Sequence, residues 1–487
     1  MGRLLRRAVE RTDGGEERVN TVISRDSHGL TSHLALLYSL LLEGPVPTED
    51  VVVHLAERLV DPTPQQIWLI LAVLRAQLPY PEDVVNWHRR ARSVGAAQVL
   101  DELSKNSGKA VRVLEGGVVV DAHNTVSSGL STGIQRVVRN VLDRWSHAYS
   151  YSLLAWDGDF GRLHQAPDGA HRVEQPTGHP AGAPSIIPWK STYLLPELSV
   201  EQPRLRRIQA LAQYSGSATG VIGYDTVPMT SAETSGPGMP AAFARNLAAV
   251  ARMDRVATIS EAAATEYAGW RLMIESAGLV GPTIQAIELP MQPIPDADPS
   301  IDPRKELGLT ASPIVVCVGS HEPRKNHVAV LHAAEVLWRE GHEFQLVFCG
   351  GNAWNSGPFT DRLAELRAAN RAVSSHSRVS DAVLNGLVRV ARFSVFPSLN
   401  EGYGLPIAES LVAGTPVVTS NFGSMAEIAK NGGALLVDPR DDTDLASAMR
   451  RMLDDDELIE RLSAEALALP TTSWAAYADK LWSYFVD

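Results

Sequence analysis

Short apolar runs and longer segments of helical periodicity take turns along most of this chain. The run at Val118 is followed by a helix-like segment, Thr132 to His147, in which apolar residues recur every three or four positions. A second run, SYSLLAW, comes next, and a similar series starts again at Ile314. A strand that returns through a helix to the same sheet runs parallel to its predecessor. The alternation therefore predicts an α/β protein with two doubly wound parallel sheets.

A chain of 487 residues is too long for one hydrophobic core. One segment with little to bury is crowded with prolines, a composition typical of a link between domains. These prolines are Pro290, Pro293, Pro295, Pro299 and Pro303. We therefore assign residues 111–290 to a first domain and residues 305–470 to a second, with a hinge between them.

The rest of the chain follows other patterns. Residues 28–106 show helical periodicity only, which predicts a helical accessory module, and residues 1–27 are expected to form a flexible terminus. Residues 471–487 form one apolar helical stripe, which packs either on the second domain or back on the first. Between Asp157 and Lys190, many Gly, Pro and His residues without an apolar period predict a long loop.

Charge and cysteine content exclude some classes of protein. A net charge of −12 argues against a general nucleic-acid binder, because phosphate backbones require clustered lysines and arginines. The two cysteines, Cys317 and Cys349, end apolar runs, which indicates buried thiols in a reducing compartment. The start of the chain lacks the long apolar region of a secretory signal, so we expect a cytoplasmic protein. Its basic residues leave open a peripheral contact with the inner face of a membrane, or an ordinary solvated terminus. They are Arg3, Arg6 and Arg7.

The clearest chemical signal is the segment VFPSLNEGYGLPIAE, Val395 to Glu409. It contains two acids, Glu401 and Glu409, eight residues apart across a glycine-rich bend. The apolar run before the bend predicts a buried strand, and Pro406 suits the first turn of a helix that begins near Gly404. Glycine lets a backbone approach a ligand closely, and a helix N-terminus favours anions such as phosphate. Such a loop suits a sugar hydroxyl, a diphosphate and a ribose together.

This segment resembles the EGFGLPxxE box of the retaining glycosyltransferases of GT-B fold known as family 4, or glycosyltransferase group 1. Further pieces follow in the family's order and cover almost the whole carboxyl half: VGSHEPRKNH from Val318, FCGG from Phe348, RVSDAVLNGLVRVARFSVFPS from Arg378 and GTPVVTSNFGSMAEIA from Gly414. The amino half matches more weakly, through STGIQRVVRNV from Ser131, GYDTVP from Gly223 and ATISEAAATEY from Ala257. The resemblance implies two Rossmann-like domains, with the acceptor mainly on the first and the nucleotide-sugar donor mainly on the second.

Transfer of a sugar from a nucleoside diphosphate requires a metal or fixed positive charge to stabilise the leaving diphosphate. Arg324 and Lys325 follow a predicted strand and precede a helix, where the guanidinium can grip phosphate oxygens bidentately and the lysine adds a point charge. Three aspartates after a helix-like run suit a solvated cap, and three histidines of the predicted loop lack ligand spacing. These are Asp454, Asp455 and Asp456, and His164, His171 and His179. We therefore expect no metal and no other cofactor.

The resemblance also implies roles for second-domain residues. Beside the two cations, Glu401 is expected to contact hydroxyls of the transferred sugar near the reaction centre, and Glu409 to hold the ribose hydroxyls. Val379 matches the position that lies against the base. Many family members carry arginine where this chain has Ser320, so the diphosphate depends more on the two cations here. The remaining donor-side groups belong to the bend, as room for a ligand or as backbone N–H donors: Gly402, Tyr403, Gly404 and Leu405.

Fewer residues of the first domain carry a role. Gly133 opens a helix, and in the family a glycine there lets the donor approach. Arg136 either lines the acceptor side or is an ordinary exposed helix residue. Related enzymes often carry a histidine before Asp225, where this chain has Tyr224, and tyrosine is not a cation at neutral pH, so the role of that histidine is not transferred. Asp225 is either a polar group of the cleft or a turn cap.

These patterns predict a retaining, metal-independent hexosyltransferase that moves a sugar from a GDP- or UDP-sugar to a hydroxyl of a glycan or glycoconjugate. Retention and the donor class come from the resemblance alone. A sugar-nucleotide epimerase, a phosphorylase and a catalytically silent binding or scaffold protein remain alternatives with the same architecture. The helical module carries no chemical signature, and a protein partner, a second subunit or the first domain itself are the alternatives for what it contacts.

Overall fold

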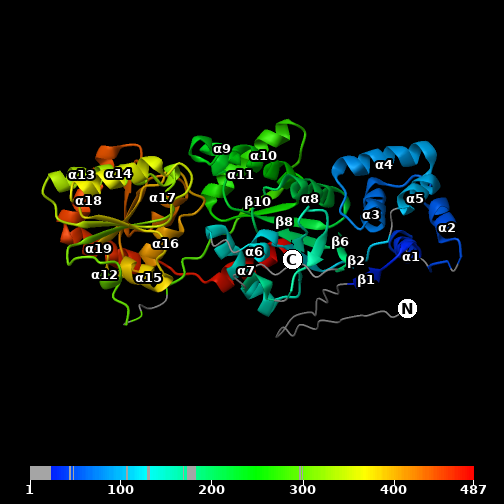
Figure 1. Ribbon diagram of the computed structural model, residues 1–487, viewed down its shortest axis with the longest axis horizontal. Coiled ribbons are helices and arrows are strands. Elements are labelled where there is room, and N and C mark those ends of the chain that lie inside the picture. Colours follow the sequence, from blue (N-terminus) through cyan, green and yellow to red (C-terminus); the bar gives the residue numbers. More distant parts are fainter. Residues whose placement is uncertain are drawn as a thin grey trace.

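The computed structural model describes residues 23–42, 45–47, 49–105, 108–128, 132–167, 169–172, 182–294, 298 and 300–487. Within these ranges the chain forms a helical amino-terminal region and two α/β domains, which lie in a row in Figure 1. The basic start at Arg3, Arg6 and Arg7 and the loop residue His179 lie outside the described residues.

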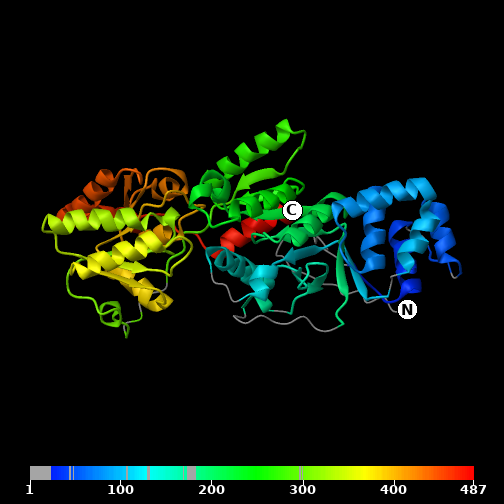
Figure 2. The same ribbon diagram turned by 45° about the horizontal axis from the view of Figure 1, so that its top comes forward.

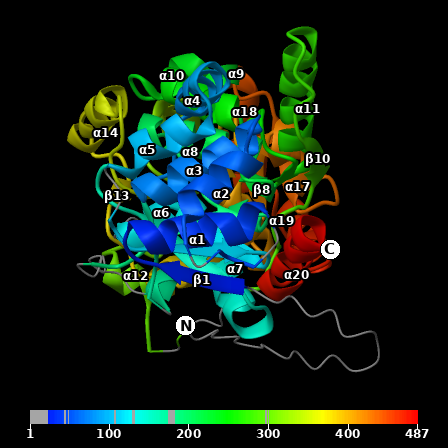
Figure 3. The ribbon, with the colours of Figure 1, turned by 90° about the vertical axis from the view of Figure 1, so that its right-hand side faces the viewer.

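The helical region is fused to the first domain. Its described helices are α1 (Leu30–Leu41), α2 (Val51–Arg58), α3 (Pro64–Arg75), α4 (Pro81–Val94) and α5 (Ala96–Ser104). Helix α3 begins with a capping box between Thr63 and Gln66 and is buried over most of its length. Its Trp68 stacks on Trp189 of the first domain, with ring centroids 6.1 Å apart. The cores of the region and of the first sheet form one continuous apolar cluster, so the region braces that domain. Figure 3 shows the helices of this region, in blue, at the front of the molecule.

The first domain is built on a sheet with ten strands among the described residues, in the order β1-β2-β6-β5-β4-β3-β7-β8-β9-β10. The strands are β1 (Ile23–Ser27), β2 (Val111–Glu115), β3 (Val118–Asp121), β4 (Ser152–Trp156), β5 (Leu163–Gln165), β6 (Ser185–Trp189), β7 (Thr192–Leu195), β8 (Ala218–Gly223), β9 (Arg255–Thr258) and β10 (Thr283–Ala286). From β4 through β3 and β7 to β10 every pair is parallel, as the alternating pattern predicted.

Helices join and cover these strands. They are α6 (His123–Ser127), α7 (Gly133–Ala148), α8 (Gln202–Tyr214), α9 (Val227–Thr230), α10 (Met239–Val250) and α11 (Glu261–Ser276), with the 3₁₀ turns η1 (Ala170–Arg172) and η2 (Ala232–Thr234). In α7 the apolar residues at helical spacing are buried, Val137, Val141 and Trp145 among them. That face packs towards the sheet, as its period predicted.

Two predictions for this domain are wrong. Residues 23–27 are not part of a flexible terminus, because β1 pairs antiparallel with β2 from Ile23 opposite Glu115 to Ser27 opposite Val111. The predicted loop from Asp157 to Lys190 contains β5 and β6, so the sheet is mixed rather than wholly parallel. Three residues of β5 are too few to show an alternation, and Pro188 interrupts the apolar run of β6. Both strands therefore depend on pairing with their neighbours in the sheet, and no local pattern in the sequence predicts them.

The second domain has a fully parallel sheet of order β13-β12-β11-β14-β15-β16 within the described residues. Its strands are β11 (Ile314–Val318), β12 (Gln345–Cys349), β13 (Val373–His376), β14 (Phe393–Phe396), β15 (Val417–Ser420) and β16 (Ala434–Val437). Its helices are α12 (Pro303–Glu306), α13 (His327–Arg339), α14 (Gly357–Ala368), α15 (Asp381–Val390), α16 (Leu405–Val412), α17 (Gly423–Ala429), α18 (Asp442–Asp454) and α19 (Asp456–Leu467), with the 3₁₀ turn η3 (Pro323–Lys325). Cys317 and Cys349 are free and buried in separate apolar clusters, although β11 and β12 are neighbours.

The last helix, α20 (Trp474–Val486), packs on the first domain. Its Trp482 stacks on Tyr149 with ring centroids 4.2 Å apart and meets the edge of Trp145 at 5.4 Å. Asp479 pairs with Arg144 of α7 at 2.9 Å. Figure 2 shows this helix in red beside the first domain. Among the described residues, none of the helices has the length and apolarity needed to cross a membrane.

Candidate active site

A strand, a bend and a helix carry the two acids singled out in the sequence. β14 is fully buried, and the chain leaves its carboxyl end through the bend that contains Glu401. Gly404, with φ of 111°, adopts a left-handed conformation that favours glycine and caps α16. Pro406 occupies the first turn of this helix, where a missing N–H costs little. Glu401 therefore lies at the carboxyl edge of the second sheet, and Glu409 lies about one turn inside α16.

Arg324 and Lys325 converge on Glu401. They lie in η3, at the carboxyl end of the neighbouring strand β11. The Arg324 guanidinium lies 2.6 Å from Oε2 of Glu401, and Lys325 Nζ donates to Oε1 at 2.6 Å. The three side chains are between 9% and 17% exposed, so this ion pair is largely screened from water. The predicted meeting of the cations with the acid of the bend is present.

Neighbouring groups hold the two cations in place. Arg324 also donates to the carboxylate of Glu322 at 2.6 Å and to the carbonyl of Asn400 at 2.8 Å. The Lys325 ammonium lies 4.8 Å from the centre of the Phe396 ring, a favourable cation–π distance. Both cations thus contact Glu401 of the bend, while Arg324 is also held by Glu322 and Asn400 and Lys325 by Phe396 of the preceding strand.

The charges shift the acidity of the group. Burial alone would raise the pKa of Glu401, but the positive charges of Arg324 and Lys325 and their hydrogen bonds outweigh it and lower the pKa to about 2. Burial raises the pKa of Glu322, which lies on the far side of Arg324. At neutral pH Glu401 is therefore a carboxylate that accepts hydrogen bonds and has no proton to give.

The bend lies against the first domain at Gly402. A Cβ atom on Gly402 would lie 2.7 Å from the carbonyl oxygen of Tyr224 and 2.8 Å from Oδ2 of Asp225, closer than a Cβ atom approaches a non-bonded atom in proteins. Asp225 accepts a hydrogen bond from the Val227 N–H at 3.1 Å, so it is a turn cap, and its other carboxylate oxygen lies against Gly402 of the second domain. Burial raises the pKa of Asp225 to about 6, although the Arg324 guanidinium opposes the shift.

The hydroxyl of Tyr224 turns away from the bend. It donates to the carbonyl of Pro196 at 2.7 Å inside the first domain. Burial raises the pKa of this phenol well above its usual value. Tyr224 thus contacts Gly402 through its backbone carbonyl, while its side chain forms a hydrogen bond with the loop that follows β7.

The start of α7 faces the start of α16. A Cβ atom on Gly133 would lie 3.7 Å from a methyl group of Leu405, an ordinary contact distance. One turn further on, the guanidinium of Arg136 forms an ion pair with the carboxylate of Glu409. Arg136 is therefore more than an exposed helix residue, because it bridges the two domains beside the acid expected to hold a ribose.

The other residues predicted for the donor side surround the same edge. Ser320 is half-buried after Gly319, and its carbonyl accepts the Glu322 N–H at 3.0 Å. Val379 is half-buried just before Ser380, the N-cap of α15. The Tyr403 hydroxyl donates to the carbonyl of Leu289 at 2.8 Å, so this side chain connects the second domain to the first.

Several cross-domain contacts were not predicted. Ser260 Oγ donates to the carbonyl of Gly402 at 2.7 Å, and Glu427 accepts the first two N–H groups of α11 at 3.0 Å. Trp354 Nε1 donates to the carbonyl of Thr234 at 2.8 Å, and Asn400 Nδ2 donates to Thr230 at 3.1 Å. Ser260 gave the one local signal, because a serine just before a helix is recognisable in a sequence as an N-cap. The other contacts pair residues far apart in the chain.

No cluster of three or more His, Cys, Asp or Glu side chains within the described part of the chain is arranged to hold a metal ion. Asp455 caps α19, where its side chain accepts the Leu458 N–H at 2.9 Å. His164 and His171 are buried in the first domain, in β5 and η1.

Solved structures share this architecture. The chain aligns with a trehalose-6-phosphate protein of Escherichia coli bound to UDP-2-fluoroglucose, with a TM-score of 0.55 and 10% identity over 76% of this chain and 98% of that one. Anabaena HepE in complex with UDP and glucose aligns with a TM-score of 0.54 and 13% identity over 76% and 99%. At such identities the likeness shows the fold alone, and it is the GT-B fold of two parallel-sheet domains.

Sequence comparison gives the family. The model for glycosyl transferases group 1 matches residues 301–468, and the second domain belongs to this family. The serotype-specific mannosyltransferase WbdA of Escherichia coli is 25% identical over 349 residues, which are 64% of this chain and 40% of that protein. The O-antigen chain mannosyltransferase B of Escherichia coli is 34% identical over 152 residues, 31% of this chain and 39% of that protein. The chain thus spans about two fifths of the length of these relatives.

Proposed function

We propose that this protein is a retaining glycosyltransferase that moves a sugar from a nucleoside diphosphate sugar to a hydroxyl of an acceptor. The observation that carries the proposal is the convergence of Arg324 and Lys325 on Glu401, at 2.6 Å each, where the second domain meets the first. Two cations fixed in a largely dry site can stabilise the charge that develops on a leaving diphosphate. Glu401, ionised because its pKa is about 2, can accept hydrogen bonds from sugar hydroxyls.

The same two cations support a reaction without a divalent metal. Arg324 binds phosphate oxygens through a planar fork of donors, and Lys325 adds a mobile point charge. Glu409 on α16 is the residue we assign to the ribose, after it exchanges Arg136 for the two ribose hydroxyls. The first domain would then hold the acceptor, and closure of the domains would exclude water.

The names of the relatives suggest a first choice of substrates. WbdA and the second relative from Escherichia coli are named mannosyltransferases, and one of them acts on an O-antigen chain by its name. We therefore propose a hexose donor, mannose first, and a glycan or glycoconjugate acceptor. The free, buried cysteines suit a reducing compartment, and we propose that the reaction takes place in the cytoplasm.

The test is incubation of the protein with GDP- and UDP-linked hexoses and a panel of glycans. We expect release of nucleoside diphosphate only when donor and acceptor are both present, unchanged by a chelator. The new bond, observed by NMR, should keep the anomeric configuration of the donor. Conversion of the sugar without nucleotide release would indicate an epimerase, dependence on phosphate would indicate a phosphorylase, and binding without turnover would indicate a silent binding protein.

A further inference from the structure

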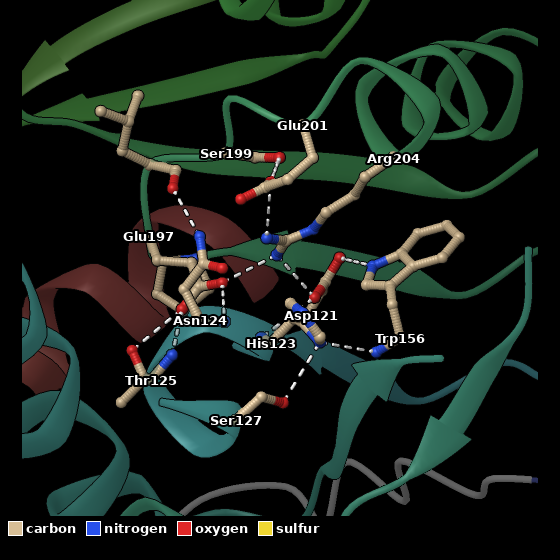
Figure 4. A network of polar contacts seen from close by, with 12 residues as sticks. Asp121, His123, Asn124, Thr125, Ser127, Trp156, Glu197, Ser199, Glu201 and Arg204 are labelled. Atoms are coloured by element: carbon tan, nitrogen blue, oxygen red, sulfur yellow. Dashed lines mark hydrogen bonds and ion pairs between the residues drawn. The ribbon is translucent and has the colours of Figure 1, made fainter. Parts of the chain in front are cut away.

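A second group of charges lies buried inside the first domain, away from the cations of the second. Asp121 ends β3, Glu197 follows β7 and Arg204 lies in α8, and all three side chains are fully buried (Figure 4). One nitrogen of Arg204 donates to both carboxylates at 2.8 Å. Removing three charges from water is unfavourable unless their hydrogen bonds are well made. The arrangement therefore calls for a reason other than stability.

Glu197 holds the start of a helix. Its Oε1 accepts the Asn124 N–H at 2.6 Å as well as the Arg204 donor, and its Oε2 accepts both the N–H and the hydroxyl of Thr125 at 2.9 Å. All four partners are donors, so each oxygen of the carboxylate accepts two hydrogen bonds. Asn124 and Thr125 belong to the first turn of α6, and Glu197 thus fixes this helix from a strand end more than 70 residues away.

Asp121, two residues before α6, connects the strands on which this helix depends. Its Oδ2 accepts from Trp156 Nε1 at 2.6 Å and from the Tyr193 hydroxyl at 2.5 Å. These partners come from β4 and β7, the two strands beside β3. Burial raises the pKa of Tyr193 well above its usual value, so its hydroxyl stays a donor. Asp121 in this way connects the carboxyl ends of β3 and β4 to Tyr193 of the neighbouring strand β7.

This edge lies on the side of the first domain that contacts the second. β3, β7 and β8 are neighbours and parallel, so their carboxyl ends lie at one edge of the sheet. Pro196, the residue before Glu197, accepts the Tyr224 hydroxyl, and the carbonyl of Tyr224 lies against Gly402 of the second domain. On the other side, α6 leads into α7, whose first residue Gly133 lies against Leu405.

Helix α6 and its C-cap residue Ser128 also carry polar side chains that bond within the first domain. Asn124 Nδ2 donates to the Leu198 carbonyl at 3.1 Å, and Ser128 Oγ donates to the Asn124 carbonyl at 2.6 Å. The Asn124 side-chain carbonyl and the serine oxygens keep acceptor capacity for hydroxyl groups. His123, Asn124, Ser127 and Ser128 are half-buried, while the apolar Val126 is buried. His123 Nδ1 accepts the Trp156 N–H at 3.1 Å, which leaves the ring proton on Nε2 in the neutral form. A short polar helix, held by Glu197 on the side of the first domain that meets the second, is suited to bind a sugar acceptor.

We infer that Glu197 is a positioning residue for the acceptor. It holds α6 on the side of the first domain that meets the second, so that acceptor recognition depends on Glu197 and donor binding does not. This inference rests on the proposed glycosyl transfer. Glu197 itself is too deeply buried to touch a substrate.

The substitution Glu197→Gln tests the inference. Glutamine keeps the shape, but its NH₂ group must replace one oxygen and would then face two donors, so two of the four hydrogen bonds are lost. We expect kcat/KM for the acceptor to fall on the order of 10²-fold. The affinity for nucleoside diphosphate, measured by calorimetry, should change less than twofold, because the cations of the second domain are untouched.

Glu201→Gln is the matched control. Glu201 also pairs with Arg204, at 3.6 Å, and is 24% exposed, but none of its described contacts reaches α6. This variant should keep the acceptor kinetics of the parent protein. Thr125→Val provides a milder second variant, since it removes one donor to Glu197 and keeps the shape, and we expect a smaller loss in the same direction.

Hydrogen exchange of the free protein separates this inference from the proposed function. In Glu197→Gln, faster exchange should be confined to the peptide that spans residues 122–128, whether or not any transferase activity is found. Equal losses of acceptor and nucleotide affinity, an equal effect of Glu201→Gln, or unchanged exchange over α6 would each overturn the inference. A wild-type protein without transfer activity would overturn the proposed function and leave the exchange result to decide the role of Glu197 in holding α6.

Discussion

Lys325 and Arg324 share one carboxylate but differ in how firmly they are held. Arg324 donates to Glu322 and to the Asn400 carbonyl as well as pairing with Glu401. For Lys325 the described polar contact is with Glu401, and an ammonium group has three donors. In the proposed reaction, Lys325 can therefore reach the diphosphate by rotation of its flexible side chain, while Arg324 stays in its fixed position.

Substitution of Lys325 by alanine should therefore act on the chemical step. We expect kcat to fall on the order of 10²-fold to 10³-fold, because one of two preorganised charges on the leaving group is lost. The melting temperature should fall as well, because Arg324 alone would then face the largely buried carboxylates of Glu322 and Glu401. Single-turnover kinetics with saturating donor measures the effect, and exposed Lys305 of α12, also changed to alanine, is the control. Full activity in the Lys325 variant would exclude it from catalysis.

At the scale of elements, the sequence predicted what local pattern and chain order determine. The strand and helix series of the second domain follows directly from alternating runs, and the cations and Glu401 meet because each follows a strand of one parallel sheet. The pairing of β1, β5 and β6 was missed, because three to five residues with weak periodicity are ordered by their neighbours. The Asp121, Glu197 and Arg204 group was missed as well, since its contacts join residues up to 83 positions apart.

The bend between β14 and α16 allows a direct test of how closely the domains must meet. In Gly402→Ala, the new methyl group would overlap the Tyr224 carbonyl, a backbone atom that cannot rotate away. We expect the domains to separate slightly and kcat/KM to fall about 10²-fold, because small displacements of reacting groups are costly. Nucleotide affinity, which depends on the second domain, should be kept.

Gly269→Ala in α11 is the control for that variant, because a Cβ atom there has open space around it. Alanine favours a helix over glycine, so this variant should be fully active and slightly more stable. Activity of Gly402→Ala equal to that of the control would show that the close approach of the bend to Tyr224 does not matter for the reaction.

At the scale of the whole molecule, one apolar cluster joins the two domains. It includes Val138 and Trp145 of the first domain, Tyr403 and Met425 of the second, and Trp482 of α20. Helix α20 follows the second domain in the chain but packs on α7 of the first. The chain therefore crosses between the domains twice, once between β10 and α12 and again before α20.

Trp482→Ala should show how strongly this second crossing couples the domains. The indole is 5% exposed and packs between Trp145 and Tyr149, so its removal should lower the free energy of unfolding of the first domain by about 3–5 kcal/mol. In calorimetry we expect the melting curve to broaden or divide, because the first domain would unfold before the second, whose parallel sheet is untouched. The exposed neighbour Ser483, changed to alanine, should keep the parent curve. A uniform downward shift of one sharp transition would instead mean that the domains unfold as a single unit, in which case α20 adds to their common stability without acting as a separate link.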